Sequence, residues 1–383
     1  MKVLWLSPYP YPGNDQHPSY WITEWADFLA QNSGLQIDVV TLSPLAKGIT
    51  ESLTKSGYAV TYLKVPRGYF DLATFYKITI SRLRNYVESV QGNYDLVHVH
   101  GIENLYHSAC VNLNLPVIIS MQGSASESIK YFKGTLKQKA HFRLRSYYEK
   151  KYLPYFKNFF CRTKWDTQFV KSNTSSPLIF HNWEMLRDDF GNIAPDADSR
   201  KILFTGGSNF LKGLNTALSV FNRLSETGKS FQLVITGKCN VEQILNQIKS
   251  KFKKINPENI SFMGFIETQE MVRVMSESFC YIHPSLLDNS PNSVCESQLA
   301  GLPVLASNVG GIPSLIDDGR TGFLLNGNIN TYAQKIELLF NNRELWNSIS
   351  TASKKKAKVR HNKDNISKIT IEAYLEIIKQ YNC

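Results

Sequence analysis

The sequence predicts an α/β fold made of two doubly wound domains of similar size. Short β-branched runs alternate with longer amphipathic stretches along most of the chain, a pattern typical of right-handed βαβ units and parallel sheets. The alternation stops near 182–199, where Asn, Asp, Gly and Pro gather, and then restarts. A length of 383 residues also fits two domains better than one.

The first domain is predicted to span 1–182. A helix is expected over 18–31, because its apolar side chains recur at helical spacing. The predicted strands are "KVLWLS", "QIDVVTLS", "YAVTYLKV", "YDLVHVH", "LPVIISMQG", "FFCRT" and "PLIF".

The second domain is predicted to span 183–364, with 182–199 as the linker. Its predicted strands are "KILFTGG", "FQLVITGK", "NISFMGF", "FCYIHPS" and "LPVLASN", and the tail from about 330 is expected to be helical. Ligands of doubly wound sheets bind at the carboxyl ends of the strands. We therefore expect the binding site in a cleft between two facing halves.

The charge balance favours anionic partners, since the formal net charge is +11. The segment 130–157 carries nine Lys and Arg against one acid, Glu149, interleaved with Phe, Tyr and Leu. This pattern fits an interfacial helix on an anionic membrane, and it equally fits the solvated face of a core helix. Nucleic acid is not predicted as a partner.

Several features argue against export and metal binding. The N-terminal apolar run ends in a Pro/Tyr cluster without a signal-peptide cleavage site. The six cysteines are scattered without metal-ligand spacing and fit reduced thiols. The "DAD" at 196–198 follows no predicted strand and is rejected as a metal site. We expect a cytoplasmic, metal-independent protein without cofactors, peripheral to the inner face of the cytoplasmic membrane if 130–157 contacts lipid.

The stretch "DNSPNSVCESQLAGLPV" (288–304) places two carboxylates, Asp288 and Glu296, on either side of a predicted helix start. The helix is expected to begin near Asn292 or Ser293 and to end at Gly301. Glu296 is then expected in the first turn, where the dipole favours an anion, and the free amides there suit a phosphate. Sugar hydroxyls, a diphosphate and ribose hydroxyls would fit this layout.

These residues and the motifs around them resemble a known family. D-x7-E followed by "SQLAGLPVLASNVGGIPSLIDDGRTGFLL" is similar to the E-x7-E signature of glycosyltransferase family 4, whose members are retaining GT-B enzymes. The resemblance extends to "LFTGGSNFLKG", "LVITG", "ISFMGFI" and "YIHPS". It implies two facing Rossmann-like domains with an interdomain cleft, and a C-terminal helix, 365–383, that packs back on the first domain.

The resemblance also implies the activity and the site. A hexose-type sugar would move from a nucleoside diphosphate, with UDP favoured, to a glycan or lipid-linked acceptor in bacterial surface polysaccharide assembly. Asp288 would hold the donor sugar, Glu296 the ribose and Lys212 the diphosphate, and these three form the catalytic set. The donor-binding set is Gly207, Ser208, Lys212, Phe265, Ile266, Asp288, Ser290, Asn292, Ser293, Glu296, Gly310 and Gly311. The acceptor-binding set is Gly13, Asn14, His100 and Gln122.

Four positions depart from the family pattern. Asp288 replaces the usual Glu, and Pro291 replaces a Gly, which removes an amide donor. Gly207 stands where an Arg usually precedes the Lys by five positions. Gln122 stands where many relatives have a His, and an amide can bond a hydroxyl but cannot carry a proton.

Other side chains and other functions stay open on the sequence. His98 and His100 are expected on opposite faces of one strand, and His283 is expected to be structural. Arg162 and Glu184 would line the cleft or pair across the domain interface. A nucleotide-sugar epimerase and a non-catalytic sugar-nucleotide-binding partner remain as alternatives. A nicotinamide oxidoreductase is disfavoured because no G-x-G-x-x-G follows the first strand.

Overall fold

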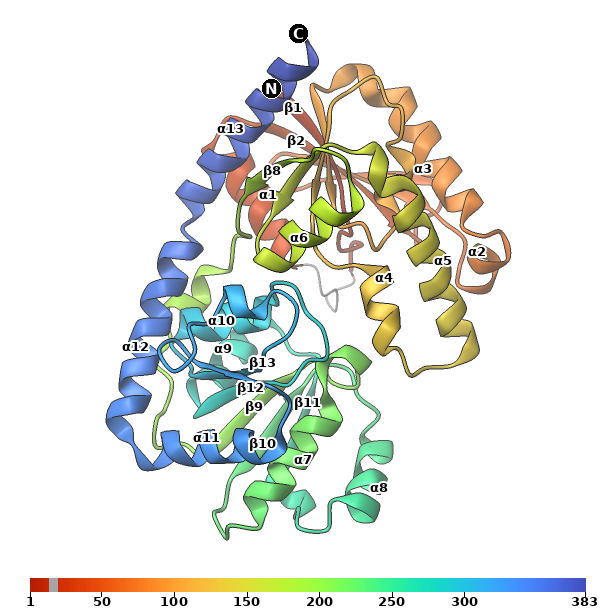
Figure 1. Cartoon of the computed structure of the whole chain (residues 1–383). Coiled ribbons are helices and arrows are strands. Elements are labelled where there is room, and N and C mark those ends of the chain that lie inside the picture. The colour runs from red at the N-terminus through yellow and green to blue at the C-terminus, as the bar shows by residue number, and fades with distance from the viewer. Residues whose placement is uncertain (14–19) are drawn as a thin grey trace. The chain divides into compact units, whose positions relative to one another are not determined.

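The computed structural model describes residues 1–13 and 20–383, and they divide into two compact units. Unit 1 comprises Met1–Met185 and Asn362–Cys383, and unit 2 comprises Leu186–His361. Each unit contains a largely parallel sheet with helices packed on it (Figure 1). The prediction of two doubly wound α/β domains is therefore confirmed.

The unit 1 sheet has the strand order β3-β4-β2-β1-β5-β6-β7-β8, and β3 alone among these strands pairs in antiparallel fashion. The strands are β1 (Lys2–Leu6), β2 (Gln36–Ser43), β3 (Ile49–Leu53), β4 (Ala59–Lys64), β5 (Leu96–His100), β6 (Val117–Ser120), β7 (Asn158–Cys161) and β8 (Leu178–His181). The helices are α1 (Tyr20–Asn32), α2 (Tyr69–Ala73), α3 (Lys77–Val90), α4 (Ala125–Ser128), α5 (Leu136–Tyr152), α6 (Lys164–Asn173) and α13 (Lys363–Tyr381).

Alternation along β1 builds two cores in unit 1, because successive side chains of a strand point to opposite faces. Val3 and Trp5 pack with residues of α1 and α13 in one core. Leu4 and Leu6 pack with residues of α3 in the other. The C-terminal helix α13 thus belongs to unit 1, where Tyr374 is fully buried.

The unit 2 sheet is parallel, with the order β11-β10-β9-β12-β13-β14. Its strands are β9 (Lys201–Thr205), β10 (Gln232–Thr236), β11 (Ile260–Gly264), β12 (Cys280–His283), β13 (Val304–Ser307) and β14 (Phe323–Leu325). Its helices are α7 (Leu214–Ser225), α8 (Val241–Lys251), α9 (Thr268–Ser276), α10 (Asn292–Ala300), α11 (Ile329–Asn341) and α12 (Arg343–Arg360).

Residues 186–199, expected as part of a linker, are packed into unit 2. Phe190 and Ile193 are buried, and the guanidinium of Arg187 lies 4.8 Å from the ring centre of Phe190. This segment includes a short 3-10 helix, Asp188–Asn192, that contacts α9 and α10. It therefore brings its own side chains next to α10, although no periodicity in the sequence predicted this packing.

No helix in the described part of the chain has both the length and the apolar character needed to cross a membrane.

Candidate functional site

The candidate site lies at the topological switch point of the unit 2 sheet. From β9 the chain adds β10 and β11 on one side, and β12 and β13 extend the sheet on the other side. The loops after β9 and β12 therefore leave the sheet in opposite directions, and ligands of doubly wound sheets bind at such a point. Every residue of the predicted catalytic set follows one of these two strands.

Glycines bring the two loops into contact. Gly213, at the start of α7, has φ +76, and a Cβ there would lie 1.9 Å from the carbonyl oxygen of Pro284. The hydroxyl of Ser285 also donates to the carbonyl of Leu211 at 2.7 Å. Only glycine allows this approach of backbone to backbone, and it places Lys212 beside the loop that carries Asp288.

Lys212 and Asp288 form an ion pair, with Nζ 2.6 Å from Oδ2. Nε2–H of His283 donates to the same oxygen at 3.0 Å, because a carboxylate can only accept. Burial tends to raise the pKa of Asp288, but Lys212 and His283 outweigh it and lower that pKa below its usual value. Burial lowers the pKa of His283. At neutral pH the group is therefore an aspartate held by one lysine and one imidazole.

A hydroxyl group contacts His283 at Nδ1, the ring nitrogen that does not face Asp288. The hydroxyl of Tyr281 lies 2.8 Å from Nδ1 of His283 and 2.8 Å from the hydroxyl of Thr205. The same hydroxyl lies 2.9 Å from Oγ of Ser293. These contacts connect β9, β12 and the first turn of α10. They hold the imidazole that orients Asp288, and His283 is fully buried, as expected of a structural residue.

The second carboxylate, Glu296, pairs with a cation that the sequence analysis missed. Nη2 of Arg187 lies 2.7 Å from Oε1 of Glu296, and Nη1 donates to Thr268 at 2.6 Å. Burial raises the pKa of Glu296, and Arg187 opposes this rise. The signal for Arg187 was weak: an arginine in a polar segment looks like a solvated linker residue.

The start of α10 is as predicted, but the place of Glu296 in it is not. The helix runs from Asn292 to Ala300, and Gly301, with φ +84, is its C-cap. Glu296 is consequently its fifth residue, and no acid lies in the first turn, so the dipole argument for this carboxylate was wrong. Pro291 occupies the N-cap, and its side chain makes no hydrogen bond to the amides of α10.

The glycines after β13 contact Asp288 directly. The amide of Gly311 donates to the carbonyl of Asp288 at 2.9 Å. Gly310 has φ +55, and a Cβ there would lie 2.0 Å from that carbonyl oxygen. The loop after β13 thus supports the backbone of the Asp288 loop.

Position 207, where the resemblance implies an arginine, has no room for a side chain in this backbone. Gly207 has φ +51, and a Cβ there would lie 2.2 Å from the carbonyl oxygen of Lys238. The amide of Ser208 donates to the same carbonyl at 3.0 Å. The loops after β9 and β10 therefore occupy the space of a side chain at 207.

The remaining predicted donor residues surround this centre at the same edge of the sheet. Phe265 and Ile266 follow β11, and Phe265 is 36% exposed. Ser290 is buried in the loop before α10, with its hydroxyl 3.9 Å from Sγ of Cys295. Asn292 and Ser293 are the first residues of α10. Among the described residues, no group of three or more His, Cys, Asp or Glu is arranged to hold a metal ion.

The predicted acceptor residues belong to unit 1. Gly13 ends the first described segment, and Asn14 lies outside the described residues. His100 is 1% exposed and is surrounded by Trp5, Trp21 and Trp25, with ring centres 4.4 to 5.9 Å away. The expectation that His98 and His100 face opposite sides is wrong: residues two apart on a strand share a face, and their ring centres are 3.8 Å apart.

Gln122 takes part in a buried ion-pair network that settles how Arg162 and Glu184 interact. Nη1 of Arg162 lies 2.8 Å from Oε2 of Glu184, and both side chains are 5% exposed. Gln122 donates to Glu184 and accepts from Arg162. All three residues belong to unit 1, so the two charged residues pair with each other within one unit.

This network gives a stability prediction. Glu184→Gln removes the charge that compensates the buried guanidinium of Arg162, so the free energy of unfolding is expected to fall by about 2 kcal/mol. Glu127→Gln is the control, because its ion pair with Lys130 is solvent-exposed and is expected to contribute less than about 1 kcal/mol. Urea titration of both variants checks the difference, and equal losses would contradict the network's role.

The buried histidines of unit 1 predict a pH dependence. Burial lowers the pKa of His98 to about 3 and that of His107 to about 4. Below their ordinary pKa near 6.5 the unfolded chain binds protons that the folded chain does not. Stability is therefore expected to fall as the pH drops below 6.5, by up to about 1.4 kcal/mol per pH unit for each histidine.

Urea titrations at pH 7, 6 and 5, followed by tryptophan fluorescence, would measure this slope. Trp5 and Trp25 report on unit 1 because their rings contact His98. His107→Leu is expected to reduce the slope of the free energy of unfolding against pH by the contribution of one histidine. A slope that stays the same in this variant would show that His107 is not buried in its neutral form.

Known protein families and sequences match this chain over part of its length. Residues 187–356 match the model of the family Glycosyl transferases group 1. An uncharacterized 41.2 kDa protein in the cps region of Klebsiella pneumoniae is 26% identical over 182 residues, 47% of this chain and 46% of that protein. The amylovoran biosynthesis glycosyltransferase AmsK of Erwinia amylovora is 29% identical over 120 residues, 30% of this chain and 29% of that protein. The chain thus matches less than half the length of these relatives.

Solved structures match over nearly the whole chain. Sucrose-phosphate synthase from Thermosynechococcus elongatus superposes with a TM-score of 0.77, covering 99% of both chains at 15% identity. HepE from Anabaena, in complex with UDP and glucose, has a TM-score of 0.72 and covers 98% of this chain and 100% of that chain at 14% identity. The chain has the two-domain, Rossmann-like GT-B fold. Within this GT-B fold, the family match covers the unit that carries Lys212, Asp288 and Glu296.

Proposed function

We propose that this GT-B protein is a retaining glycosyltransferase that moves a hexose-type sugar from a nucleoside diphosphate to an acceptor hydroxyl. One observation carries the proposal. Two carboxylates, each paired with a cation, lie on either side of the first turn of α10 at the switch point of unit 2. The match of this unit to Glycosyl transferases group 1 supports the same reading.

The arrangement suits the three parts of a nucleotide sugar. Asp288 accepts hydrogen bonds from the sugar hydroxyls, and Glu296 accepts those of the ribose. Lys212 and the amides of Asn292 and Ser293 face the diphosphate between them. Arg187 holds the carboxylate of Glu296 in place in the free protein.

In the proposed reaction, no side chain of the protein acts as a base. The bond from the anomeric carbon to the phosphate oxygen breaks, and a bond from that carbon to the acceptor oxygen forms on the same face. The departing phosphate oxygen takes the acceptor proton. Lys212 and the α10 amides stabilise the negative charge that develops on the leaving group. Gln122 then needs only to bind a hydroxyl, which an amide can do.

We propose UDP-sugar as the donor and a glycan or lipid-linked acceptor, in bacterial surface polysaccharide assembly. The solved complex of HepE, which holds UDP and glucose, supports the choice of donor. The name of AmsK, an amylovoran biosynthesis glycosyltransferase, supports the choice of pathway. The basic segment 130–157 suits an acceptor at the inner face of the cytoplasmic membrane.

A donor screen tests the proposal. UDP-, GDP- and ADP-sugars are each assayed for a rise in melting temperature and for slow hydrolysis without acceptor. A UDP-sugar is expected to give both effects. Tight binding without hydrolysis or transfer would favour a non-catalytic sugar-nucleotide-binding partner. Absence of binding by all three classes would overturn the donor site.

A further inference from the structure

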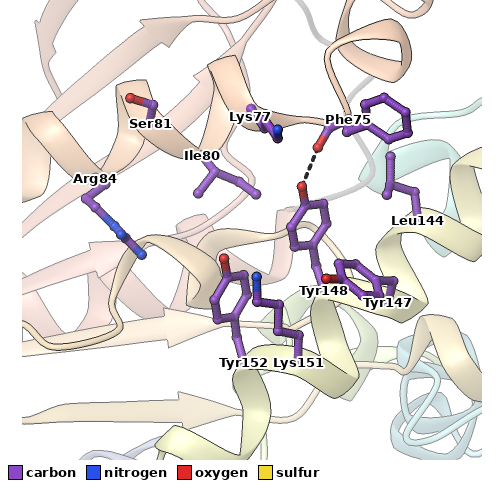
Figure 2. A pocket seen from close by; sticks show the side chains of 10 residues that line it. All are labelled: Phe75, Lys77, Ile80, Ser81, Arg84, Leu144, Tyr147, Tyr148, Lys151 and Tyr152. Atoms are coloured by element: carbon purple, nitrogen blue, oxygen red, sulfur yellow. Dashed lines mark hydrogen bonds between the residues drawn. The ribbon is translucent and has the colours of Figure 1, made fainter.

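A pocket of about 670 Å³ lies in unit 1 between α3 and α5 (Figure 2). It shares no residue with the donor site of unit 2. Its described lining residues are Phe75, Lys77, Ile80, Ser81, Arg84, Leu144, Tyr147, Tyr148, Lys151 and Tyr152.

Aromatic and aliphatic side chains give the pocket a fixed wall. The hydroxyl of Tyr148 donates to the carbonyl of Phe75 at 2.5 Å, as the dashed line in Figure 2 shows. The ring of Tyr148 stacks on that of Tyr152, with an interplanar angle of 5°. Ile80 and Leu144 add apolar surface from α3 and α5. The pocket is therefore formed before any ligand binds.

The charges of the pocket are positive. Lys77, Arg84 and Lys151 line it, and none of its described lining residues is acidic. Nη2 of Arg84 donates to the carbonyl of Ser108 at 3.0 Å, while its Nε is buried without a hydrogen-bond partner among the described residues. Nζ of Lys151 lies 5.1 Å from the ring centre of Tyr152. An anion in the pocket would balance the charge of these three cations.

The surface around the pocket is aromatic and basic. Tyr69, Phe70 and Tyr155 are 69%, 74% and 62% exposed. The single acid of α5, which is described throughout, is Glu149, and it is fully buried among hydroxyl and amide donors of Ser124 and Ala125. The exposed charges of α5 are therefore all positive. Exposed aromatic rings among basic residues fit the headgroup layer of an anionic membrane better than a soluble polyanion.

We propose that the pocket between α3 and α5 binds the phosphate headgroup of an anionic membrane lipid, with α2 and α5 against the lipid surface. The cations contact the phosphate, and the tyrosine and phenylalanine rings contact the glycerol and upper acyl region. This site is independent of the donor site, so its failure and that of the proposed glycosyltransferase activity are separately observable.

Two serine variants distinguish binding of the headgroup in the pocket from general electrostatic attraction of the basic surface to the membrane. Ser81 lines the pocket, whereas Ser89 is exposed on the same helix, about 12 Å further along at 1.5 Å per residue. Ser81→Asp is expected to weaken binding to mixed phosphatidylcholine–phosphatidylglycerol vesicles at least about fivefold. Ser89→Asp adds the same charge beyond a Debye length and is expected to change binding less than about twofold.

Two double lysine variants compare the pocket with the surrounding basic surface by removing positive charge. Lys77→Ser/Lys151→Ser is expected to weaken vesicle binding more than Lys133→Ser/Lys150→Ser, since the latter pair lies outside the pocket. Co-sedimentation measures both, and donor binding confirms that the variants are folded. Equal losses within each pair, or equal binding to pure phosphatidylcholine vesicles, would overturn the headgroup pocket.

Competition distinguishes the source of the phosphate. Dihexanoyl phosphatidic acid, which is soluble as monomers, is expected to displace the protein from vesicles, and Ser81→Asp is expected to lower its affinity. Glycerol 3-phosphate has the same phosphate without acyl chains and is expected to compete far less. Equal competition by the two would identify a soluble phosphate ester as the occupant and would overturn the lipid proposal.

Discussion

Asp288→Asn is expected to lower the rate of sugar transfer by about 10²- to 10³-fold, because it removes a charge while keeping the shape of the side chain. The pKa of Asp288 is lowered, so the group is a carboxylate throughout the neutral range. Asparagine accepts fewer hydrogen bonds from the sugar and no longer balances Lys212, which lies 2.6 Å away.

The affinity for UDP alone should change little in Asp288→Asn, because the ribose contact and the α10 amides remain. Transfer kinetics and calorimetric UDP binding test the two parts separately. Asp317→Asn is the matched control: it breaks a surface ion pair with Lys356 in the same unit and should leave both quantities unchanged. An equal loss of affinity and rate in Asp288→Asn would contradict its assignment to the donor sugar.

Glu296→Ala is expected to weaken nucleotide binding about 10- to 100-fold, the loss of hydrogen bonds to a charged acceptor. This carboxylate is proposed to hold the ribose, and in the free protein it pairs with Arg187 at 2.7 Å. The loss should be as large for UDP as for a UDP-sugar, since the sugar is not involved. Calorimetry with both ligands measures it.

Two further variants distinguish the two possible causes of an affinity loss in Glu296→Ala: the lost contact to the ribose and the arginine left without its partner. Arg187→Met removes the cation alone, and the double variant removes both. If the double variant binds UDP as weakly as Glu296→Ala, the carboxylate itself is responsible. Restored affinity in the double variant would show that the free guanidinium caused the loss. Glu277→Ala, which breaks a surface pair with Lys201, should bind UDP normally.

Most strands could be predicted from the sequence, because a β-branched run between two turns identifies a strand wherever that strand lies in the sheet. The parallel sheets followed from their alternation with helices. Two strands escaped. β3 (Ile49–Leu53) has a side-chain pattern without buried residues, and it is an antiparallel edge strand. β14 (Phe323–Leu325) has three residues and is defined by pairing with β13 rather than by its own sequence.

The sequence by itself determined the fold class and the order of chemistry along the chain: a lysine after one strand, an aspartate after another, and a glutamate in the helix that follows. Periodicity and turn residues are local, so they can be read without coordinates. Only the tertiary structure decided the partners. Arg187 meets Glu296 across 109 residues, and Lys212 meets Asp288 across 76. Such contacts depend on how strands are ordered in a sheet, which no local pattern encodes.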